Sequence, residues 1–260
     1  MSVFAQKPKP NVLLILTDDM GYGDLSCYGS PNNYTPNLDK LASRGTRFNR
    51  CYAGSVVCSP SRASILTGRF PLRYDIGWAF TDNDEFLPVE PTNLPNLLKA
   101  NGYQTARIGK WHLGGPRIKD YEAGTAGKKA NPGPLQQGFT YYLANIEDPL
   151  VRADLIKNRI LYREGGKTMV RDGRRAAPEA GNWETIKVNE SLAFIEQCKT
   201  DKKPFSVNLW FDTPHTPYEP IEPFVKEFEQ IGATGDQLYA RSMIKHLDTQ
   251  IGRLIDQLDT

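Results

Sequence analysis

The chain has 260 residues, of which 39% are hydrophobic and 24% are charged, with 32 lysines and arginines against 30 aspartates and glutamates. This composition is typical of a globular protein and excludes a disordered or fibrous chain, and the near balance of charge argues against nucleic acid as the main partner. The longest apolar run covers residues 12–16, far short of the ~20 residues that a membrane span needs.

Residues 1–9 allow two interpretations. Val3, Phe4 and Ala5 before Gln6 resemble the end of a secretory signal, which would make the mature protein periplasmic or secreted. The alternative is a disordered arm, because the charged and apolar segments that precede such a cleavage site are absent.

Strands and helices are predicted to alternate along the rest of the chain. In chain order we expect a strand over residues 11–17, a helix over 37–43, a strand over 46–52, helices over 61–67 and 94–100, a strand over 103–108, a helix over 183–198, a strand over 205–211 and a helix over 237–258. The first strand is a continuous apolar run, as in parallel sheets. Thr35 and Pro36 are expected to be the N-cap and first residue of the first helix.

This order favours an α/β fold with a mixed, mostly parallel sheet sandwiched by helices on both faces. Residues 114–182 are the least regular part and are expected to form an irregular basic insertion, because basic side chains outnumber acidic ones there. A solvated insertion explains this excess, and a basic rim for an anionic substrate is the alternative.

Reactive residues follow three of the predicted strands. In chain order they are Asp18 and Asp19, then Lys110 and His112, and then Asp212 and His215. Ligands bind beyond the carboxyl ends of the strands in open α/β sheets, so we expect these residues to meet in one pocket that suits a metal and an anion. Hard oxygen ligands favour Ca²⁺ or Mg²⁺. The alternatives are a solvated acidic turn and histidines that the backbone satisfies.

Cys58 is predicted at a helix N-terminus, where free N–H groups favour an anion and lower the pKa of a thiol. Arg62 follows one helical turn later and can share that face. The alternative is a partly buried thiol beside a solvated arginine. The remaining cysteines, Cys27, Cys51 and Cys198, form no CxxC pair and are expected to be buried thiols, or one disulfide and a free thiol in an exported protein.

Several segments together resemble the type I sulfatases of the alkaline phosphatase superfamily. They are PNVLLILTDDMGYGDLSCYG, TPNLDKLASRGTRFNRCYA, VCSPSRASILTGRFPLR, GYQTARIGKWHLG, PFSVNLWFDTPHTPYEP and YARSMIKHLDTQIGRLIDQL. The pieces CSPSR and GKWHLG are highly specific for that family. The resemblance is weakest over residues 114–182, and it implies a sulfatase catalytic domain over residues 10–260.

The resemblance implies a modified nucleophile. The cysteine of the family motif, here Cys58, is converted to 3-oxoalanine (formylglycine) by a formylglycine-generating or sulfatase-maturating enzyme that reads Cys-x-Pro-x-Arg. One hydroxyl of the hydrated aldehyde attacks the ester sulfur and the alcohol leaves. The second hydroxyl then expels sulfate and restores the aldehyde.

The other site residues are also carried over from the resemblance. Asp18 and Asp19 resemble ligands of Ca²⁺, with Mg²⁺ as the alternative ion, and modified Cys58 would supply a further oxygen. Arg62 would hold the formylglycine hydroxyl, and Lys110 would bridge formylglycine and sulfate. His112 would be the base that assists collapse of the diol, and His215 the acid toward the leaving alcohol.

The expected function is therefore hydrolysis of sulfate esters on a sulfated small molecule or, given the basic excess, a sulfated glycan. The alternatives are a phosphonate or phosphodiester hydrolase of the same superfamily and an inactive truncated fragment. Family members continue past the position of Thr260 with a second pair of metal ligands and a sulfate-binding lysine. We therefore expect the catalytic domain to be incomplete at its C-terminus and the chain by itself to bind metal poorly and turn over slowly.

Overall fold

The computed structural model describes residues 8–81, 85–89, 92–116, 131–145, 169–177, 179 and 181–259. The interpretation of residues 3–6 as the end of a signal lies outside the described residues, as does most of the expected basic insertion. Within the described residues, one sheet has the strand order β1-β6-β2-β3-β4-β5. The first four strands in that order are parallel, whereas β4 and β5 pair antiparallel.

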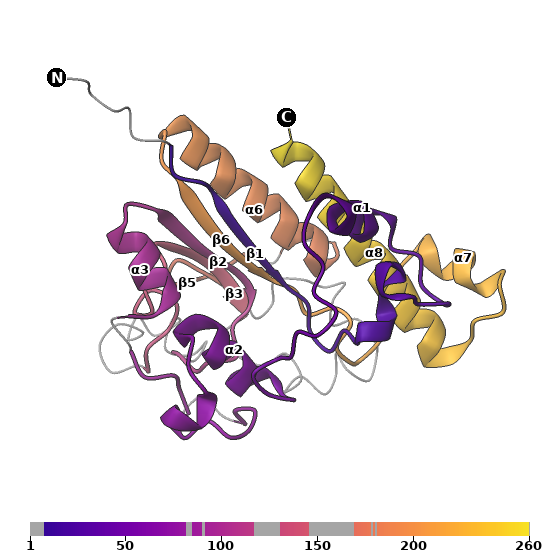
Figure 1. Cartoon of the computed structure of the whole chain (residues 1–260), viewed down its shortest axis with the longest axis horizontal. Coiled ribbons are helices and arrows are strands. Elements are labelled where there is room, and N and C mark those ends of the chain that lie inside the picture. The colour runs from indigo at the N-terminus through magenta and orange to yellow at the C-terminus, as the bar shows by residue number, and fades with distance from the viewer. Residues whose placement is uncertain are drawn as a thin grey trace.

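The elements follow the predicted alternation (Figure 1). The strands are β1 (Val12–Leu16), β2 (Gln104–Lys110), β3 (Tyr141–Asn145), β4 (Met169–Arg171), β5 (Arg174–Arg175) and β6 (Phe205–Trp210). The helices are α1 (Pro36–Arg44), α2 (Cys58–Thr67), α3 (Leu94–Ala100), α6 (Trp183–Thr200), α7 (Phe224–Glu229) and α8 (Gly235–Leu258), with short 3-10 helices η1 (Tyr22–Asp24), η2 (Ser26–Tyr28) and η3 (Pro71–Tyr74). The expected mixed, mostly parallel α/β sheet is confirmed.

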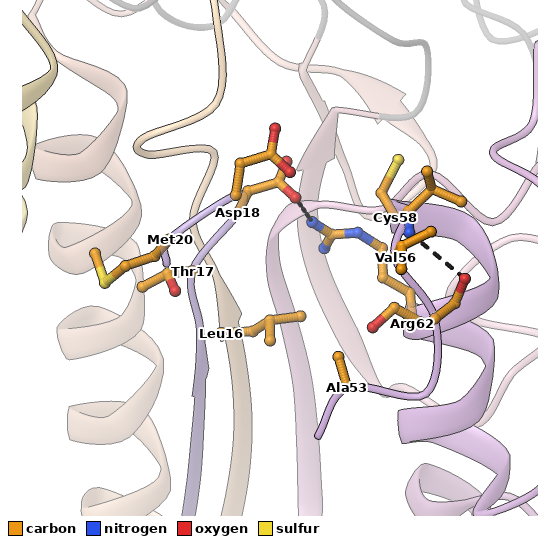
Figure 2. A pocket seen from close by; sticks show the side chains of 12 residues that line it. Leu16, Thr17, Asp18, Met20, Ala53, Val56, Cys58 and Arg62 are labelled. Carbon is orange, nitrogen blue, oxygen red and sulfur yellow. Dashed lines mark hydrogen bonds and ion pairs between the residues drawn. The ribbon is translucent and has the colours of Figure 1, made fainter. Parts of the chain in front are cut away.

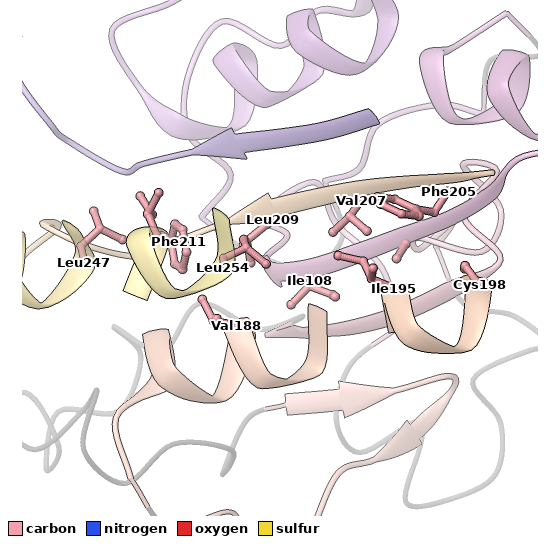
Figure 3. Close-up of a cluster of buried hydrophobic side chains, with 12 residues drawn as sticks. Ile108, Val188, Ile195, Cys198, Phe205, Val207, Leu209, Phe211, Leu247 and Leu254 are labelled. Atoms are coloured by element: carbon pink, nitrogen blue, oxygen red, sulfur yellow. The ribbon is translucent and has the colours of Figure 1, made fainter. Parts of the chain in front are cut away.

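Helices cover both faces of the sheet, so its central strands β2 and β6 are buried on both sides, although one side also carries polar residues such as Arg107 and Asn208. On one face, Val207 and Leu209 of β6 pack with Ile108 of β2 against α6 and α8 (Figure 3). On the other face, Trp210 of β6 belongs to a second cluster that includes Leu66 of α2. Alternate residues of one strand therefore enter two different cores, as the period of two requires.

Helix α1 starts where Thr35 and Pro36 predict, but its cap comes from a distant residue. The Thr35 hydroxyl contacts Ser26 Oγ at 2.8 Å and makes no cap bond to its own helix. Instead, the buried Asp248 carboxylate of α8 accepts from the backbone N–H groups of Asn37 and Leu38, at 3.3 and 2.9 Å. This carboxylate satisfies the first turn of α1 and fastens α1 to α8.

Two expectations about local structure are wrong. Residues 46–52 form no strand; their side chains are exposed and the stretch is held by Tyr28, whose hydroxyl donates to the carbonyl of Phe48 at 2.9 Å. The cysteines are all free thiols, and Cys198 is buried as expected, but Cys51 is exposed and Cys27 is only half-buried. Strands β3, β4 and β5 were not predicted, because they lie within the irregular region and β4 and β5 are only a few residues long.

None of the helices among the described residues combines the length and the hydropathy needed to cross a membrane.

Candidate active site

The carboxyl ends of four neighbouring parallel strands meet at one edge of the sheet. Leu16 of β1 is level with Trp210 of β6, Gly109 of β2 is level with the same tryptophan, and Lys110 of β2 is level with Asn145 of β3. The residues that follow these strands therefore share one rim, which is where α/β sheets bind their ligands.

Asp18 is the centre of a buried ion cluster on this rim. Its Oδ1 lies 3.1 Å from Arg62 Nη2, and its Oδ2 accepts a hydrogen bond of 2.6 Å from Lys110 Nζ. We call Asp18, Arg62 and Lys110 the Asp18 cluster. Burial by itself raises the pKa of Asp18, but Arg62 and Lys110 outweigh it and hold that pKa below its ordinary value. Two buried cations thus stand against one buried carboxylate, and the cluster has a surplus of positive charge.

The cations of this cluster are held rigidly. Arg62 Nη1 donates to the carbonyl of Lys110 at 3.1 Å, and the Arg62 guanidinium lies 5.2 Å from the centre of the Trp210 ring. For Lys110, burial lowers the pKa of the amine, but the nearby acidic groups, Asp18 first and then Asp212, together outweigh it and hold that pKa above its ordinary value, so the amine stays charged. A fixed pair of cations is prepared for an anion without reorganisation.

Cys58 is the first residue of α2, as the sequence predicts. Its Sγ lies 3.0 Å from His112 Nδ1, and His112 Nε2 lies 2.9 Å from the carbonyl oxygen of Phe80. A carbonyl oxygen can only accept, so Nε2 carries a proton, and in the neutral ring Nδ1 is an acceptor whose lone pair faces Cys58 Sγ. His112 is therefore oriented to take a proton from whatever group occupies position 58.

Asp19 and His215 form a more open pair beside the cluster. His215 Nε2 lies 3.6 Å from Asp19 Oδ2, and the Asp19 side chain is 63% exposed. His215 Nδ1 donates to the carbonyl of Thr216 at 2.6 Å, which leaves Nε2 directed at the rim. Asp19 has φ of 60° and His112 has φ of 50°, a left-handed backbone that residues other than glycine rarely adopt.

A cavity of about 330 Å³ opens beside these residues. Asp18, Asp19, Cys58 and Arg62 line it, together with apolar side chains that include Val56. Figure 2 shows the Arg62 side chain reaching from α2 toward Asp18, with Cys58 at the start of the same helix. The volume lies at the lower end of the range for small-molecule sites.

A family model described as "Sulfatase" matches residues 10–260. The chain belongs to the sulfatase family. Among curated proteins it is 30% identical to N-acetylgalactosamine-6-sulfatase of Canis lupus familiaris, over 96% of this chain and 47% of the relative. It is 33% identical to arylsulfatase G of Mus musculus, over 97% of this chain and 49% of the relative. This sulfatase chain thus spans about half the length of the curated relatives that it matches.

A solved structure similar to this sulfatase is the crystal structure of Ps i-CgsB in complex with k-i-k-neocarrahexaose. It superposes with a TM-score of 0.78 at 27% identity, over 97% of this chain and 55% of that chain. The putative sulfatase yidJ from Bacteroides fragilis, with a TM-score of 0.77 at 21% identity, shares the fold. The expected alkaline phosphatase-like sulfatase fold is therefore confirmed over nearly the whole chain.

One electrostatic expectation for the sulfatase motif is wrong. The start of a helix was expected to lower the pKa of Cys58, but burial raises it, and the nearby Lys110 does not reverse this. A thiolate is therefore disfavoured at position 58. The unmodified cysteine is a poor anionic nucleophile in this environment.

The expected metal ligands have suitable chemistry but do not form a complete site. Carboxylates such as Asp18 and Asp19 are the hard donors that Ca²⁺ takes, roughly six to eight oxygens at a time. Both oxygens of Asp18 already contact Arg62 and Lys110. In the part of the chain that the structure describes, no group of three or more His, Cys, Asp or Glu side chains is placed to hold a metal ion. The residues present fit part of a calcium site.

Sequence reasoning missed two polar residues that border the candidate site. Glu184 and Lys187 on α6 are buried and contact Asp212, which follows β6. The signal that could have found them is a glutamate and a lysine three residues apart, on a helix face that also carries Ile195.

Proposed function

We propose that the protein hydrolyses sulfate esters, and that sulfated carbohydrate is the substrate class. The observation that carries this proposal is the Asp18 cluster, whose surplus positive charge borders the cavity next to Cys58. A buried excess of cations favours binding of an anion, and the fixed guanidinium and ammonium groups match the oxygens of a sulfate group. Family membership supports the same reaction.

The group at position 58 is proposed to be formylglycine rather than cysteine. Residues 58–62 read Cys-Ser-Pro-Ser-Arg, the Cys-x-Pro-x-Arg pattern that a formylglycine-generating or sulfatase-maturating enzyme recognises. The hydrated aldehyde would supply an oxygen nucleophile where burial disfavours a thiolate. Its oxygen would occupy the position from which Cys58 Sγ now contacts His112.

The two histidines of the site are assigned to opposite proton transfers. His112 Nδ1 lies against position 58 and acts as a base there, because its Nε2 is fixed by the carbonyl of Phe80. His215 Nε2, which lies 3.6 Å from Asp19 Oδ2, serves as the acid toward the leaving alcohol. Arg62 is assigned to hold the formylglycine hydroxyl, and Lys110 to bridge formylglycine and the sulfate group.

Calcium is proposed as the resident ion, with Asp18 and Asp19 among its ligands. A bound divalent cation would offset the charge that develops on the sulfate oxygens. Asp19 has the exposed carboxylate that such an ion needs, and Asp18 already lies among the groups that orient the sulfate.

The substrate class is suggested by the relatives. One is an N-acetylgalactosamine-6-sulfatase and one solved neighbour is bound to a neocarrahexaose. A sulfated glycan is therefore a better candidate than a simple aryl ester. Export to the periplasm or the medium is part of this proposal, since such glycans lie outside the cell.

Cys58→Ala tests the proposal most directly. The intact protein, produced together with a maturating enzyme, is expected to hydrolyse p-nitrophenyl sulfate, and Cys58→Ala is expected to lower kcat/KM by about 10⁴-fold or more, because the nucleophile is gone. Peptide mass spectrometry should find residue 58 about 18 Da lighter than cysteine. Faster hydrolysis of an aryl phosphodiester than of the sulfate, or full activity with unmodified Cys58, would contradict the proposal.

A further inference from the structure

A second buried ion cluster lies next to the Asp18 cluster. Lys187 Nζ donates to Glu184 Oε2 at 2.8 Å and also to Asp212 Oδ2. The three side chains are at most 2% exposed. We call Glu184, Lys187 and Asp212 the Glu184 cluster. It joins helix α6 to the segment that follows strand β6 and does not line the cavity described above.

The Glu184 cluster is tied to the backbone of that segment. Glu184 Oε1 accepts from the N–H groups of Asp212 and Thr213, at 3.2 and 2.9 Å. Asp212 Oδ1 accepts from Asn145 Nδ2 at 3.3 Å. One carboxylate oxygen therefore fixes two consecutive peptide groups at the end of β6, and an amide from β3 holds the other carboxylate.

The same segment connects to two residues of the proposed reaction. The carbonyl of Thr213 accepts from the backbone N–H of Asp18 at 3.1 Å, and the carbonyl of Asp212 accepts from the N–H of His215 at 2.8 Å. The chain of contacts runs from Glu184 to Thr213 to Asp18 on one side, and from Asp212 to His215 on the other.

We propose that Glu184 and Lys187 are positioning residues, which set where the His215 imidazole lies relative to the Asp18 cluster. This inference rests on the proposed function, because it gives His215 and the Asp18 cluster their roles. Glu184 holds the two peptide groups in place, and Lys187 holds both carboxylates of its cluster in position through its contacts with them. Neither residue touches the substrate.

The physical argument for positioning is that a buried ion group is a poor source of stability. Taking charges out of water costs about as much as their mutual attraction returns, and apolar side chains of similar volume often stabilise a core as well or better. The ion cluster instead fixes the orientation of the backbone after β6. One carboxylate oxygen can accept from two peptide N–H groups in only a narrow range of geometries. Polar groups that orient the residues of a site typically change activity by about 10–100-fold when removed.

The test compares three variants of the intact protein. Glu184→Ala leaves the N–H groups of Asp212 and Thr213 without their acceptor, and kcat for p-nitrophenyl sulfate is expected to fall by about 10–100-fold with a smaller change in KM. Glu184→Gln keeps an acceptor oxygen and should recover most of that loss. Glu190→Ala is the matched control, because Glu190 lies on the same helix and binds Arg171 at 2.8 Å, away from the segment after β6.

Hydrogen exchange gives a readout that needs no substrate. In Glu184→Ala, peptides containing Asp18 and Thr213 are expected to exchange faster, whereas Glu190→Ala should leave them unchanged at the same temperature relative to its own Tm. Equal losses of kcat in the alanine variants, or unchanged exchange at Asp18 in Glu184→Ala, would overturn the inference. If the wild-type protein hydrolyses no sulfate ester, the proposed function fails, while the exchange data still decide whether Glu184 orders this segment.

Discussion

The two ion clusters at the end of the sheet have opposite imbalances of charge. In the Asp18 cluster, Arg62 and Lys110 share one carboxylate and leave a surplus of positive charge at the edge of a cavity. In the Glu184 cluster, Lys187 is shared by two carboxylates, and the negative surplus is met by backbone N–H groups and by Asn145.

This difference in charge distinguishes a cluster that holds the fold in place from a cluster that can bind a ligand. In the Glu184 cluster the surplus negative charge accepts hydrogen bonds from the protein's own N–H groups. No charge there requires a ligand, so this cluster acts within the fold. A buried surplus of positive charge beside a cavity can be balanced by an anion that binds there. Burial and ion pairing alone would not have distinguished the two clusters; the identity of the remaining partners does.

Lys187→Met should produce the largest effect, and on stability. Removal of the lysine leaves Glu184 and Asp212 buried as uncompensated carboxylates, and the free energy of unfolding is expected to fall by about 3–5 kcal/mol. Urea denaturation followed by circular dichroism measures this. The triple variant Lys187→Met, Glu184→Gln and Asp212→Asn removes all three charges and should recover most of the loss. A loss below about 1 kcal/mol in the single variant would mean that water reaches the cluster.

Lys110→Met should lower activity on p-nitrophenyl sulfate by about 10²–10³-fold, equivalent to about 2.7–4 kcal/mol, because a cation that stabilises charge in the transition state is lost. Inhibition by free sulfate should weaken in parallel, which steady-state kinetics would detect. The control is Lys99→Met, at an exposed position on α3. If Lys110→Met retains the sulfate inhibition constant of the wild type, the positive surplus does not bind the anion.

His246 provides a contrast with Asp18, because no group of opposite charge offsets the effect of burial on the pKa of His246. Burial and the nearby Arg253 lower the pKa of His246 to about 4, whereas an unfolded histidine has a pKa of about 6.5. The unfolded state therefore binds the proton first, and stability should be constant above pH 6.5 and decrease as the pH falls from 6.5 to 4. The expected loss is about 2–3 kcal/mol.

The variant His246→Gln should flatten this slope, as measured by urea denaturation at several pH values. Asp18 does not confuse the measurement, because its pKa lies below the ordinary aspartate value and its contribution is lost only at lower pH. An unchanged slope in His246→Gln would assign the pH dependence to another group.

The sequence predicts the elements whose signal is local. Strand β6, which alternates Phe205, Val207 and Leu209 with other residues, is buried on both faces, and α8 has a stripe of apolar residues, so both elements were expected within two residues of their bounds. The strand ends also predict the site, because parallel strands bring their carboxyl ends together whatever their order. Asp18, Lys110 and His112 reach one rim from strands about 90 residues apart in the chain.

What the sequence does not show depends on partners distant along the chain. The cap of α1 comes from Asp248, 211 residues beyond Asn37, so the local pattern at Thr35 gave the position of the helix start but not the group that bonds it. The pKa of Cys58 depends on burial that the other elements create, which the start of a helix does not reveal. The Glu184 cluster needs α6, β3 and β6 in place before its charges meet.

The left-handed backbone conformations of Asp19 and His112 place selection for stability and selection for activity in conflict at these two positions. Glycine at either position would relieve conformational strain on the order of 1 kcal/mol, and it would also delete a side chain of the proposed reaction. A library screened only for resistance to heat or protease would therefore enrich glycine at position 19, where the side chain is exposed, and less at position 112, where glycine also removes the hydrogen bond to the carbonyl of Phe80. A library screened for turnover would retain aspartate and histidine, so these two positions would report which pressure a lineage has experienced.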